Sequence, residues 1–278
     1  MKNARLLLIP PLLFLIVFFV YPIAAMLARS VSGGAAGGLS VQTYVEVLRQ
    51  PVYLLILANT FRIAAIVTAV CLAIGYPTAY YLTQMAGDRA PIYLAFVAVP
   101  YFTSVLVRTY AWMVLLGNDG LINHLLLGMH VVSAPVKLLY TDTGVVVGMT
   151  YVLLPYMIIA LYAVMHGIDQ TLVRAAAAFG AGPWERFRRV FFPLSLPGVV
   201  GGSLLVFVIA LGFFITPALM GGPSDQMIAM LIQTAVEQLL NWNLASVLGT
   251  LLLAATVVGL VFYDRLVGLE KMLGRGTP

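Results

Sequence analysis

Arg108 is the residue whose type and position most directly suggest chemistry, because it lies well inside an apolar run and precedes Tyr110 and Trp112. A charge at membrane depth is costly to desolvate, so it is considered first as a functional residue. A guanidinium there can line a translocation path or close a gate, or it can extend to the outer interface among aromatic residues. Both interpretations stay open. The candidate path or gate residues are Arg108, Tyr110, Trp112, Phe213, Phe214 and Thr216.

Residue sets that carry catalysis or bind metals are missing from the sequence. It contains no G-x-x-x-x-G-K-[ST] loop, so the chain does not bind ATP in the manner of that motif. His124, His130 and His166 lack metal-ligand spacing, Cys71 stands alone in an apolar run, and no nucleophile pairs with a base. We therefore expect a non-enzymatic chain with no catalytic residue, no metal site and no cofactor of its own.

A charged segment between two apolar runs predicts a helical hairpin over 169–193. Asp169 is a suitable N-cap, and the run Ala175–Ala178 has the highest intrinsic helix propensity. Gly180 is a natural C-terminal stop. Pro183 fits the first position of a second short helix, which we expect Pro193 and Pro197 to end.

The composition requires a membrane protein. Apolar residues make up 62% of the 278 residues and charged residues 9%, and the mean hydropathy is +1.02. Crossing the hydrocarbon core takes about 20 apolar residues, and six runs are near or above that length. We predict an all-α membrane protein with one transmembrane domain over 1–278 and spans at about 6–28, 60–86, 90–117, 143–167, 197–220 and 243–266.

The distribution of Lys and Arg predicts the orientation, because cytoplasmic loops carry an excess of these residues. With both termini and the hairpin inside, the outer loops hold only Arg29, Arg49 and Lys137. The net charge of +5 is then a topology signal and does not indicate nucleic-acid binding. The inner residues are Lys2, Arg5, Arg89, Arg174, Arg186, Arg188, Arg189, Arg265, Lys271 and Arg275.

Four features are expected at the outer side. Residues 41–48 can form a short helix that bears Glu46, and the loop over 118–142 is long enough for a surface or re-entrant helix. Thr216 and Pro217 are expected to interrupt the fifth span near its outer end. Arg62, near the outer end of the second span, is expected to extend to the interface.

The hairpin carries a specific spacing of residues. Arg174, Ala175 and Ala176 are followed by Gly180, and then by Val190, Phe192 and Pro193. This pattern resembles the EAA loop of the membrane subunits of type I ABC importers, although Arg174 stands where that family usually has Glu. The segments at 106–126 and 211–232 are similar to the polyamine-type permeases, which take up spermidine and putrescine.

This resemblance implies a six-helix permease with a cytoplasmic coupling helix in the inner membrane of a bacterium, with both termini in the cytoplasm. The implied partners are a second homologous permease, two cytosolic ABC ATPases that hold ATP and Mg²⁺, a periplasmic or lipid-anchored binding protein, and membrane lipid. Outer loops near 118–142 and 217–237 would meet the binding protein. The implied ATPase-coupling residues are Arg174, Ala175, Ala176, Gly180, Ala181 and Pro183.

The substrate stays open on the residues alone. A site for a polycation should offer carboxylates and aromatic faces, but no predicted span has Asp or Glu at its middle. Arg108 would repel a cation, so a zwitterionic or anionic solute, such as an aminophosphonate or an amino-acid derivative, is the alternative. A secondary transporter is a further alternative, although such proteins usually have intramembrane acidic residues and an internal repeat.

Overall fold

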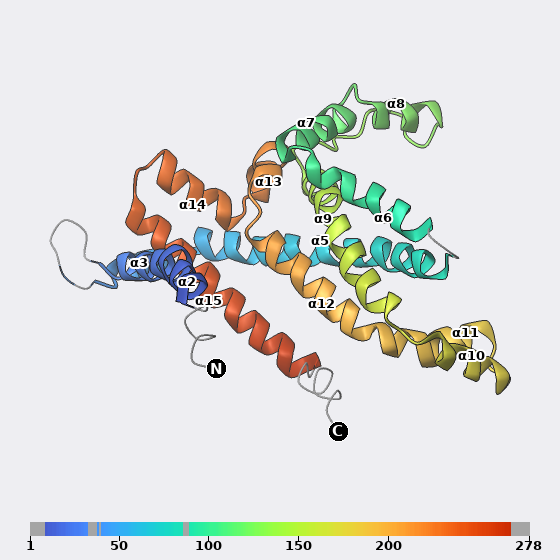
Figure 1. The fold of residues 1–278 in the computed structure, drawn as a ribbon. Helices are drawn as coiled ribbons and strands as arrows, with labels where there is room; N and C mark the ends of the chain where they lie inside the picture. Colours follow the sequence, from blue (N-terminus) through green and yellow to red (C-terminus); the bar gives the residue numbers. More distant parts are fainter. Residues whose placement is uncertain (1–8, 33–37, 39, 86–88, 268–278) are drawn as a thin grey trace. The chain divides into compact units, whose positions relative to one another are not determined.

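The structure is a computed structural model that describes residues 9–32, 38, 40–85 and 89–267, and its regular elements are helices (Figure 1). The chain divides into two compact units, one over 1–58 and 227–262 and the other over 59–226 and 263–278. The single membrane domain stays a prediction. Residues 6–8 of the first predicted span, and Lys2, Arg5, Lys271 and Arg275 of the orientation argument, lie outside the described residues.

The first unit has a small apolar core between its short and long helices. Val47, Ile56, Ile228, Val247 and Leu248 are buried together. The helices of this unit are α2 (Ile9–Leu15), the π-helical turn η1 (Ile16–Val20), α3 (Tyr21–Ser30), α4 (Gln42–Arg49), the start of α5 (Pro51–Gln84), α14 (Ile228–Glu237) and most of α15 (Trp242–Val267). The expected outer helix over 41–48 is therefore present as α4.

The second unit is built around α9, which packs along α12. Met157 and Leu161 on α9 and Val206 on α12 are completely buried. Besides the rest of α5, its helices are α6 (Arg89–Ala98), the 3₁₀ turn η3 (Val99–Phe102), α7 (Val105–Leu116), α8 (Leu121–Gly128), α9 (Asp142–His166), α10 (Gln170–Ala178), α11 (Pro183–Arg186), the π-helical turn η4 (Phe187–Phe191), α12 (Phe192–Leu211), α13 (Ile215–Met220) and the 3₁₀ turn η5 (Pro223–Asp225).

Among the described residues, five helices are long and apolar enough to cross a membrane, or six if a bent pair counts as one span. The bent pair corresponds to the third predicted span, 90–117, which is not one straight helix. Arg89–Phe102 and Val105–Gly128 meet at 95°. Thr103 and Ser104 between them have extended ψ angles of 143° and 135°, which interrupt the helical backbone.

The fifth predicted span, 197–220, is not one continuous helix, and its break does not lie at Thr216 and Pro217. The helix is continuous over Pro183–Leu211 and ends 14 residues after Pro197. The break lies at 212–214, where Phe214 leaves helical geometry, and Thr216 and Pro217 are already inside α13. Proline is tolerated in the first turn of a helix because its missing N–H would have no intrahelical acceptor there, so Pro217 starts a helix and does not interrupt one.

Candidate functional site

The hairpin begins with a capped helix, as the sequence predicts. The Asp169 side chain accepts a hydrogen bond of 2.8 Å from the Thr171 N–H, which satisfies one of the free donors at the start of α10. Hydrogen bonding from Thr171, by its side chain and its backbone, lowers the pKa of the Asp169 carboxyl. The cap is therefore formed by the ionised carboxylate at neutral pH.

Gly180 makes the turn between the two helices of the hairpin. Its φ is +85°, a conformation that side chains with a β-carbon disfavour. The Gly180 N–H bonds to the Ala177 carbonyl and the Ala181 N–H to the Ala176 carbonyl, each at 3.0 Å. This pair of hydrogen bonds is a Schellman motif, which ends α10 and redirects the chain toward Pro183 at the start of α11.

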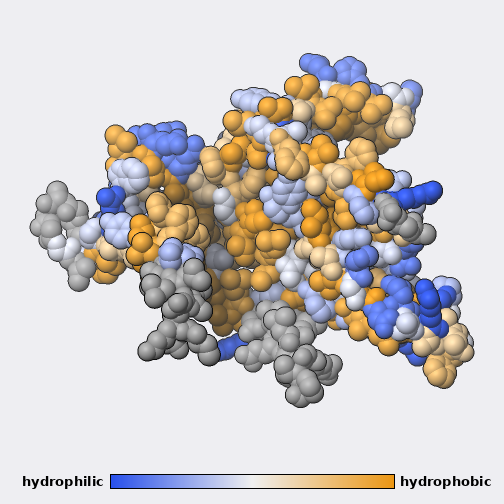
Figure 2. All heavy atoms as spheres, in the orientation of Figure 1, coloured by the Kyte–Doolittle hydropathy of each residue, from blue (hydrophilic) through white to orange (hydrophobic). Residues whose placement is uncertain are grey.

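The tip of the hairpin presents apolar side chains to solvent. Phe179 is 92% exposed and Trp184 is 68% exposed. Arg174, Ala175, Gly180 and Pro183 are also exposed, whereas Ala176 and Ala181 are half-buried. Figure 2 shows hydrophilic residues gathered around this end of the second unit, so the exposed aromatic rings lie within a polar surface. Exposed apolar groups rimmed by polar ones are typical of protein–protein contact sites.

The base of the hairpin is fixed to α5 by aromatic rings. The Tyr80 ring lies 5.4 Å from the Phe187 ring and 4.8 Å from the Phe191 ring, both in edge contact. The Tyr76 hydroxyl and the Ser195 hydroxyl are 2.8 Å apart and hydrogen-bonded. Such aromatic contacts each contribute about 0.5–1.5 kcal/mol beyond area burial. Displacing the hairpin therefore requires moving its attachment to α5.

The expectation that Pro193 ends the second hairpin helix is wrong, and the π-helical turn explains why. The Phe192 N–H donates to the Phe187 carbonyl, five residues back, immediately before Pro193. A wider turn relieves the clash of a proline ring with the preceding carbonyls, so the helix continues. The same arrangement precedes Pro22, where the Tyr21 N–H donates to the Ile16 carbonyl. Consequently, the second helix of the hairpin and α12 form one continuous helix over Pro183–Leu211.

The candidate path residues are only partly brought together. Thr216 on α13 is fully buried, and its hydroxyl lies 3.2 Å from the Thr109 hydroxyl on α7. Arg108 precedes Thr109, and its buried Nε has no hydrogen-bond partner in the described part of the chain. The Trp112 ring packs edge-on against Tyr151 on α9 at 5.5 Å. Tyr110 is exposed, Phe214 is at the border of exposure and Phe213 is half-buried.

The contact between α9 and α13 depends on a glycine. A β-carbon on Gly148 would lie 2.6 Å from Thr216 Cγ2 and 2.7 Å from Met220 Sδ, closer than atoms in contact allow. Gly148 therefore permits α13 to pack directly on α9 while Thr216 holds α7. The three helices α7, α9 and α13 therefore meet at a buried contact.

Comparison with known proteins identifies the family. A model described as "Binding-protein-dependent transport system inner membrane component" matches residues 90–269. The chain belongs to this family. It is 34% identical to the spermidine/putrescine transport system permease protein PotB of Haemophilus influenzae over 270 residues, 96% of this chain and 90% of that protein. It is 28% identical to the putative 2-aminoethylphosphonate transport system permease protein PhnU of Salmonella typhimurium, over 73% of this chain and 71% of that protein.

A solved structure shows the same fold. A chain of the bacterial alginate ABC transporter, in complex with an alginate pentasaccharide-bound periplasmic protein, superposes with a TM-score of 0.76 at 15% identity, covering 99% of this chain and 96% of that one. The family confirms the predicted type of protein: a multi-pass inner-membrane permease of a binding-protein-dependent ABC importer, without ATPase activity or a cofactor of its own. It implies a transporter complex with an ATPase and a binding protein, and it excludes a secondary transporter.

Sequence reasoning missed a cluster of polar residues at one end of this permease unit. Arg62 does not simply extend to an interface, because its guanidinium forms an ion pair of 2.6 Å with Asp142, the first residue of α9. Both side chains are about half exposed, so this pair alone contributes at most about 1 kcal/mol. The ion pair matters because it holds α5 next to the start of α9.

The same face of α5 holds the loop after α13. Asn59, one turn before Arg62, donates to the carbonyls of Ser224 and Gln226 at 3.3 and 3.0 Å. Asp225 is 3% exposed and accepts from the Gly222 N–H at 2.7 Å. Burial disfavours the ionised form of Asp225, but the hydrogen bond from Gly222 and other polar neighbours hold the pKa of this carboxyl below its usual value.

One signal in the sequence could have revealed this cluster. Asn59 and Arg62 are three residues apart and therefore lie on one face of a helix that is otherwise apolar. Polar residues on one face of a membrane helix predict a polar partner. The identity of that partner, Asp142, depends on the packing of α9 beside α5, which periodicity does not specify. No group of three or more His, Cys, Asp or Glu that could hold a metal ion occurs among the described residues.

Proposed function

We propose that this permease imports polyamines of the spermidine and putrescine class. The observation that carries the proposal is the 34% identity with the spermidine/putrescine permease over 96% of the chain, which includes the hairpin and the segments around α7 and α13. The absence of carboxylates from the middle of the predicted spans then has a simple interpretation. The binding protein selects the substrate, and the path conducts it without a deep cationic site of its own.

The hairpin is the coupling element in this proposal. Its exposed Phe179 and Trp184 insert into a groove of a cytosolic ATPase, and Ala175 and Gly180 permit close approach because they lack bulk. Because the helix is continuous over Pro183–Leu211, about 43 Å at 1.5 Å per residue, a movement of the hairpin is transmitted along α12. Nucleotide shifts the permease equilibrium only if the hairpin contacts differ between ATPase states.

The assembly would contain this permease, a second homologous permease, two ATPases and a periplasmic or lipid-anchored binding protein, with both termini in the cytoplasm. Arg108, Thr216 and the aromatic residues of α7 would line or gate the path. Accessibility tests this topology, because Cys71 is the single cysteine and is buried. A cysteine placed at Phe179 should react with an impermeant maleimide in inside-out vesicles and not in right-side-out ones.

A zwitterionic or anionic substrate is the rival. It is favoured by the 28% identity with the putative 2-aminoethylphosphonate permease and by the unpartnered Arg108 Nε, a donor suited to an anionic group. Spermidine and 2-aminoethylphosphonate both carry a primary ammonium, so the anionic phosphonate group is what distinguishes the rival substrate from a polyamine.

The deciding experiment is ATPase activity of the copurified complex in lipid nanodiscs. Candidate binding proteins would be supplied empty or loaded with spermidine, putrescine or 2-aminoethylphosphonate. We expect stimulation with the polyamine-loaded protein. Stimulation by the phosphonate-loaded binding protein and by no polyamine-loaded one would favour the rival substrate. A permease that copurifies with no ATPase would refute the coupling role of the hairpin.

A further inference from the structure

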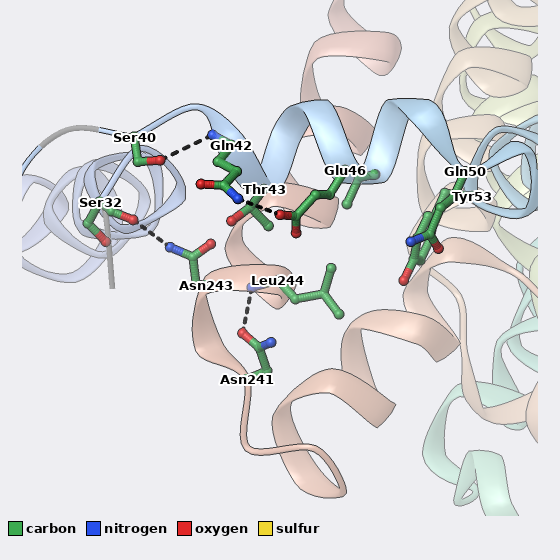
Figure 3. Close-up of a pocket in the computed structure, with 11 residues that line it drawn as sticks. Ser32, Ser40, Gln42, Thr43, Glu46, Gln50, Tyr53, Asn241, Asn243 and Leu244 are labelled. Atoms are coloured by element: carbon green, nitrogen blue, oxygen red, sulfur yellow. Dashed lines mark hydrogen bonds between the residues drawn. The ribbon is translucent and has the colours of Figure 1, made fainter. Parts of the chain in front are cut away.

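A cavity of about 380 Å³ lies in the first unit, between α4 and the segment that leads into α15 (Figure 3). Its volume is within the roughly 300–1,000 Å³ typical of small-ligand pockets. α4 contributes Gln42 and Glu46, Gln50 directly follows α4, and Tyr53 lies in the first turn of α5. Asn241 and Asn243 form the opposite wall.

The wall opposite α4 is fixed by hydrogen bonds that use the backbone. The Asn243 amide nitrogen donates to the Arg29 carbonyl at 3.1 Å and to the Ser32 carbonyl at 2.8 Å. The Asn241 side-chain oxygen accepts from the Leu244 N–H at 3.0 Å. Below α4, Val47 belongs to the apolar core of the unit. The cavity is therefore preformed, which lowers the entropic cost of binding.

The cavity is suited to a cation. Glu46 is the only residue among those that line it to be charged at neutral pH. One of its carboxylate oxygens accepts from Gln42 at 3.0 Å, and in Figure 3 the carboxylate points into the space between α4 and the asparagine wall. Glu46 forms no ion pair within the described ranges. The nearby Arg29 guanidinium is directed elsewhere, 5.9 Å from the centre of the Trp242 ring.

The lining favours an organic ammonium over a metal ion. Ca²⁺ takes six to eight oxygen ligands, typically with several carboxylates, whereas one carboxylate lines this cavity. An ammonium needs a few acceptors and gains from an aromatic face, which Tyr53 offers. Val47 and Leu244 supply apolar surface for a methylene chain. We propose that this cavity binds the primary ammonium of a small aliphatic diamine, with Glu46 as its counter-ion.

This inference rests on the proposed polyamine import for its role in transport, although the binding itself can be tested alone. The full chain with its partner subunits would be placed in nanodiscs of zwitterionic lipid, without binding protein, and titrated with putrescine. The uncharged 1,4-butanediol is the matched ligand control. We expect saturable binding of the diamine at low salt and none of the diol.

The chain offers a matched control variant. Glu237 on α14 accepts from Gln233 four residues earlier at 3.1 Å, just as Glu46 accepts from Gln42, but Glu237 does not line the cavity. We expect Glu46→Gln to weaken putrescine binding at least about tenfold, which corresponds to 1.4 kcal/mol, and Glu237→Gln to leave it unchanged. Gln50→Glu adds a second carboxylate and should tighten binding, which keeps a test available if Glu46→Gln fails to fold.

The outcomes separate the site from the function. No binding of putrescine by the wild type, equal binding of the diol, or equal behaviour of the two glutamate variants would overturn the ammonium site. If the diamine binds through Glu46 but no polyamine-loaded binding protein stimulates ATPase activity, the proposed function fails and the site stands. If polyamines are imported with no dependence on Glu46, the function stands and the site fails.

Discussion

Gly180 allows the coupling role of the hairpin to be tested through one backbone conformation. At φ +85°, a residue with a β-carbon costs roughly 1–2 kcal/mol more than glycine. Nothing lies within 4 Å of the position of that β-carbon, so the cost comes from the backbone and not from a clash. The equilibrium constant for the closed turn should therefore fall about 5- to 30-fold in Gly180→Ala.

Gly180→Asp should have a larger effect than Gly180→Asn. Its negative charge lies beside the C-terminal end of α10, where the helix dipole disfavours it by about 0.3–1 kcal/mol. Asparagine and aspartate both tolerate the left-handed region better than alanine, so the comparison of these two variants isolates the effect of the charge. The hairpin tip is exposed and has little packing of its own. The free-energy changes of these variants therefore alter the fraction of chains whose turn is closed and able to bind the ATPase.

The assay is stimulation of ATPase activity by loaded binding protein, together with substrate uptake, in proteoliposomes. Activity should be highest in the wild type, lower in the Asn variant, and lower again in both the Ala and the Asp variants, while expression and membrane insertion stay unchanged. Gly182→Ser is the control, since its φ is −65° and its side chain also has open space. Wild-type coupling in both the Ala and Asp variants would refute the argument, as would an equal loss in Gly182→Ser.

Other parts of the permease give further expectations. Gly148→Leu forces a side chain against Thr216, so we expect a loss of about 1–3 kcal/mol, seen as a lower Tm in detergent. Arg62→Ala removes the ion-pair partner of Asp142, which neighbours Asp225, and should speed hydrogen exchange at the Gly222 amide that Asp225 binds. Arg49→Ala, at an exposed position of α4, should not. The pKa of the Asp225 carboxyl is lower in the folded chain than its ordinary value of 3.8. The ionised carboxylate therefore stabilises the fold at pH values above 3.8, and this stabilisation is lost as the pH falls through the lowered pKa. Exchange at that amide should therefore accelerate only below about pH 4, and acceleration near neutrality would contradict the assignment.

Sequence rules that act over a few residues predicted the structure correctly where backbone groups determine it. Asp169, Gly180 and Pro183 occupy the cap, the turn and the helix start that their residue types predict, because each acts on backbone groups within a few residues. Composition and apolar runs were sufficient for an all-helical membrane protein. The spacing around Gly180 was sufficient for the family, which residues 90–269 confirm.

Local rules failed where a distant contact or a change of helix type decides the structure. Pro193 was expected to end a helix, but a π-helical turn upstream lets the helix continue, and no residue type specifies such a turn. The ion pair of Arg62 depends on Asp142, which is remote in sequence. The candidate path residues were chosen by type, and of these only Thr216 has a buried polar contact that joins two helices.

The placement of the helix breaks gives a physical route from the hairpin to the candidate gate. α12 continues the second helix of the hairpin without a break, so a displacement of that helix would displace α12 with it. The chain then leaves helical geometry at 212–214, which lets α13 change its direction relative to α12. α13 is in turn joined to α7 through the Thr216 and Thr109 hydroxyls, next to Arg108. A continuous helix followed by a short break and a polar contact can convert a displacement at the ATPase into a reorientation at the candidate gate. A helix that ended at Pro193 could not transmit the displacement in this way.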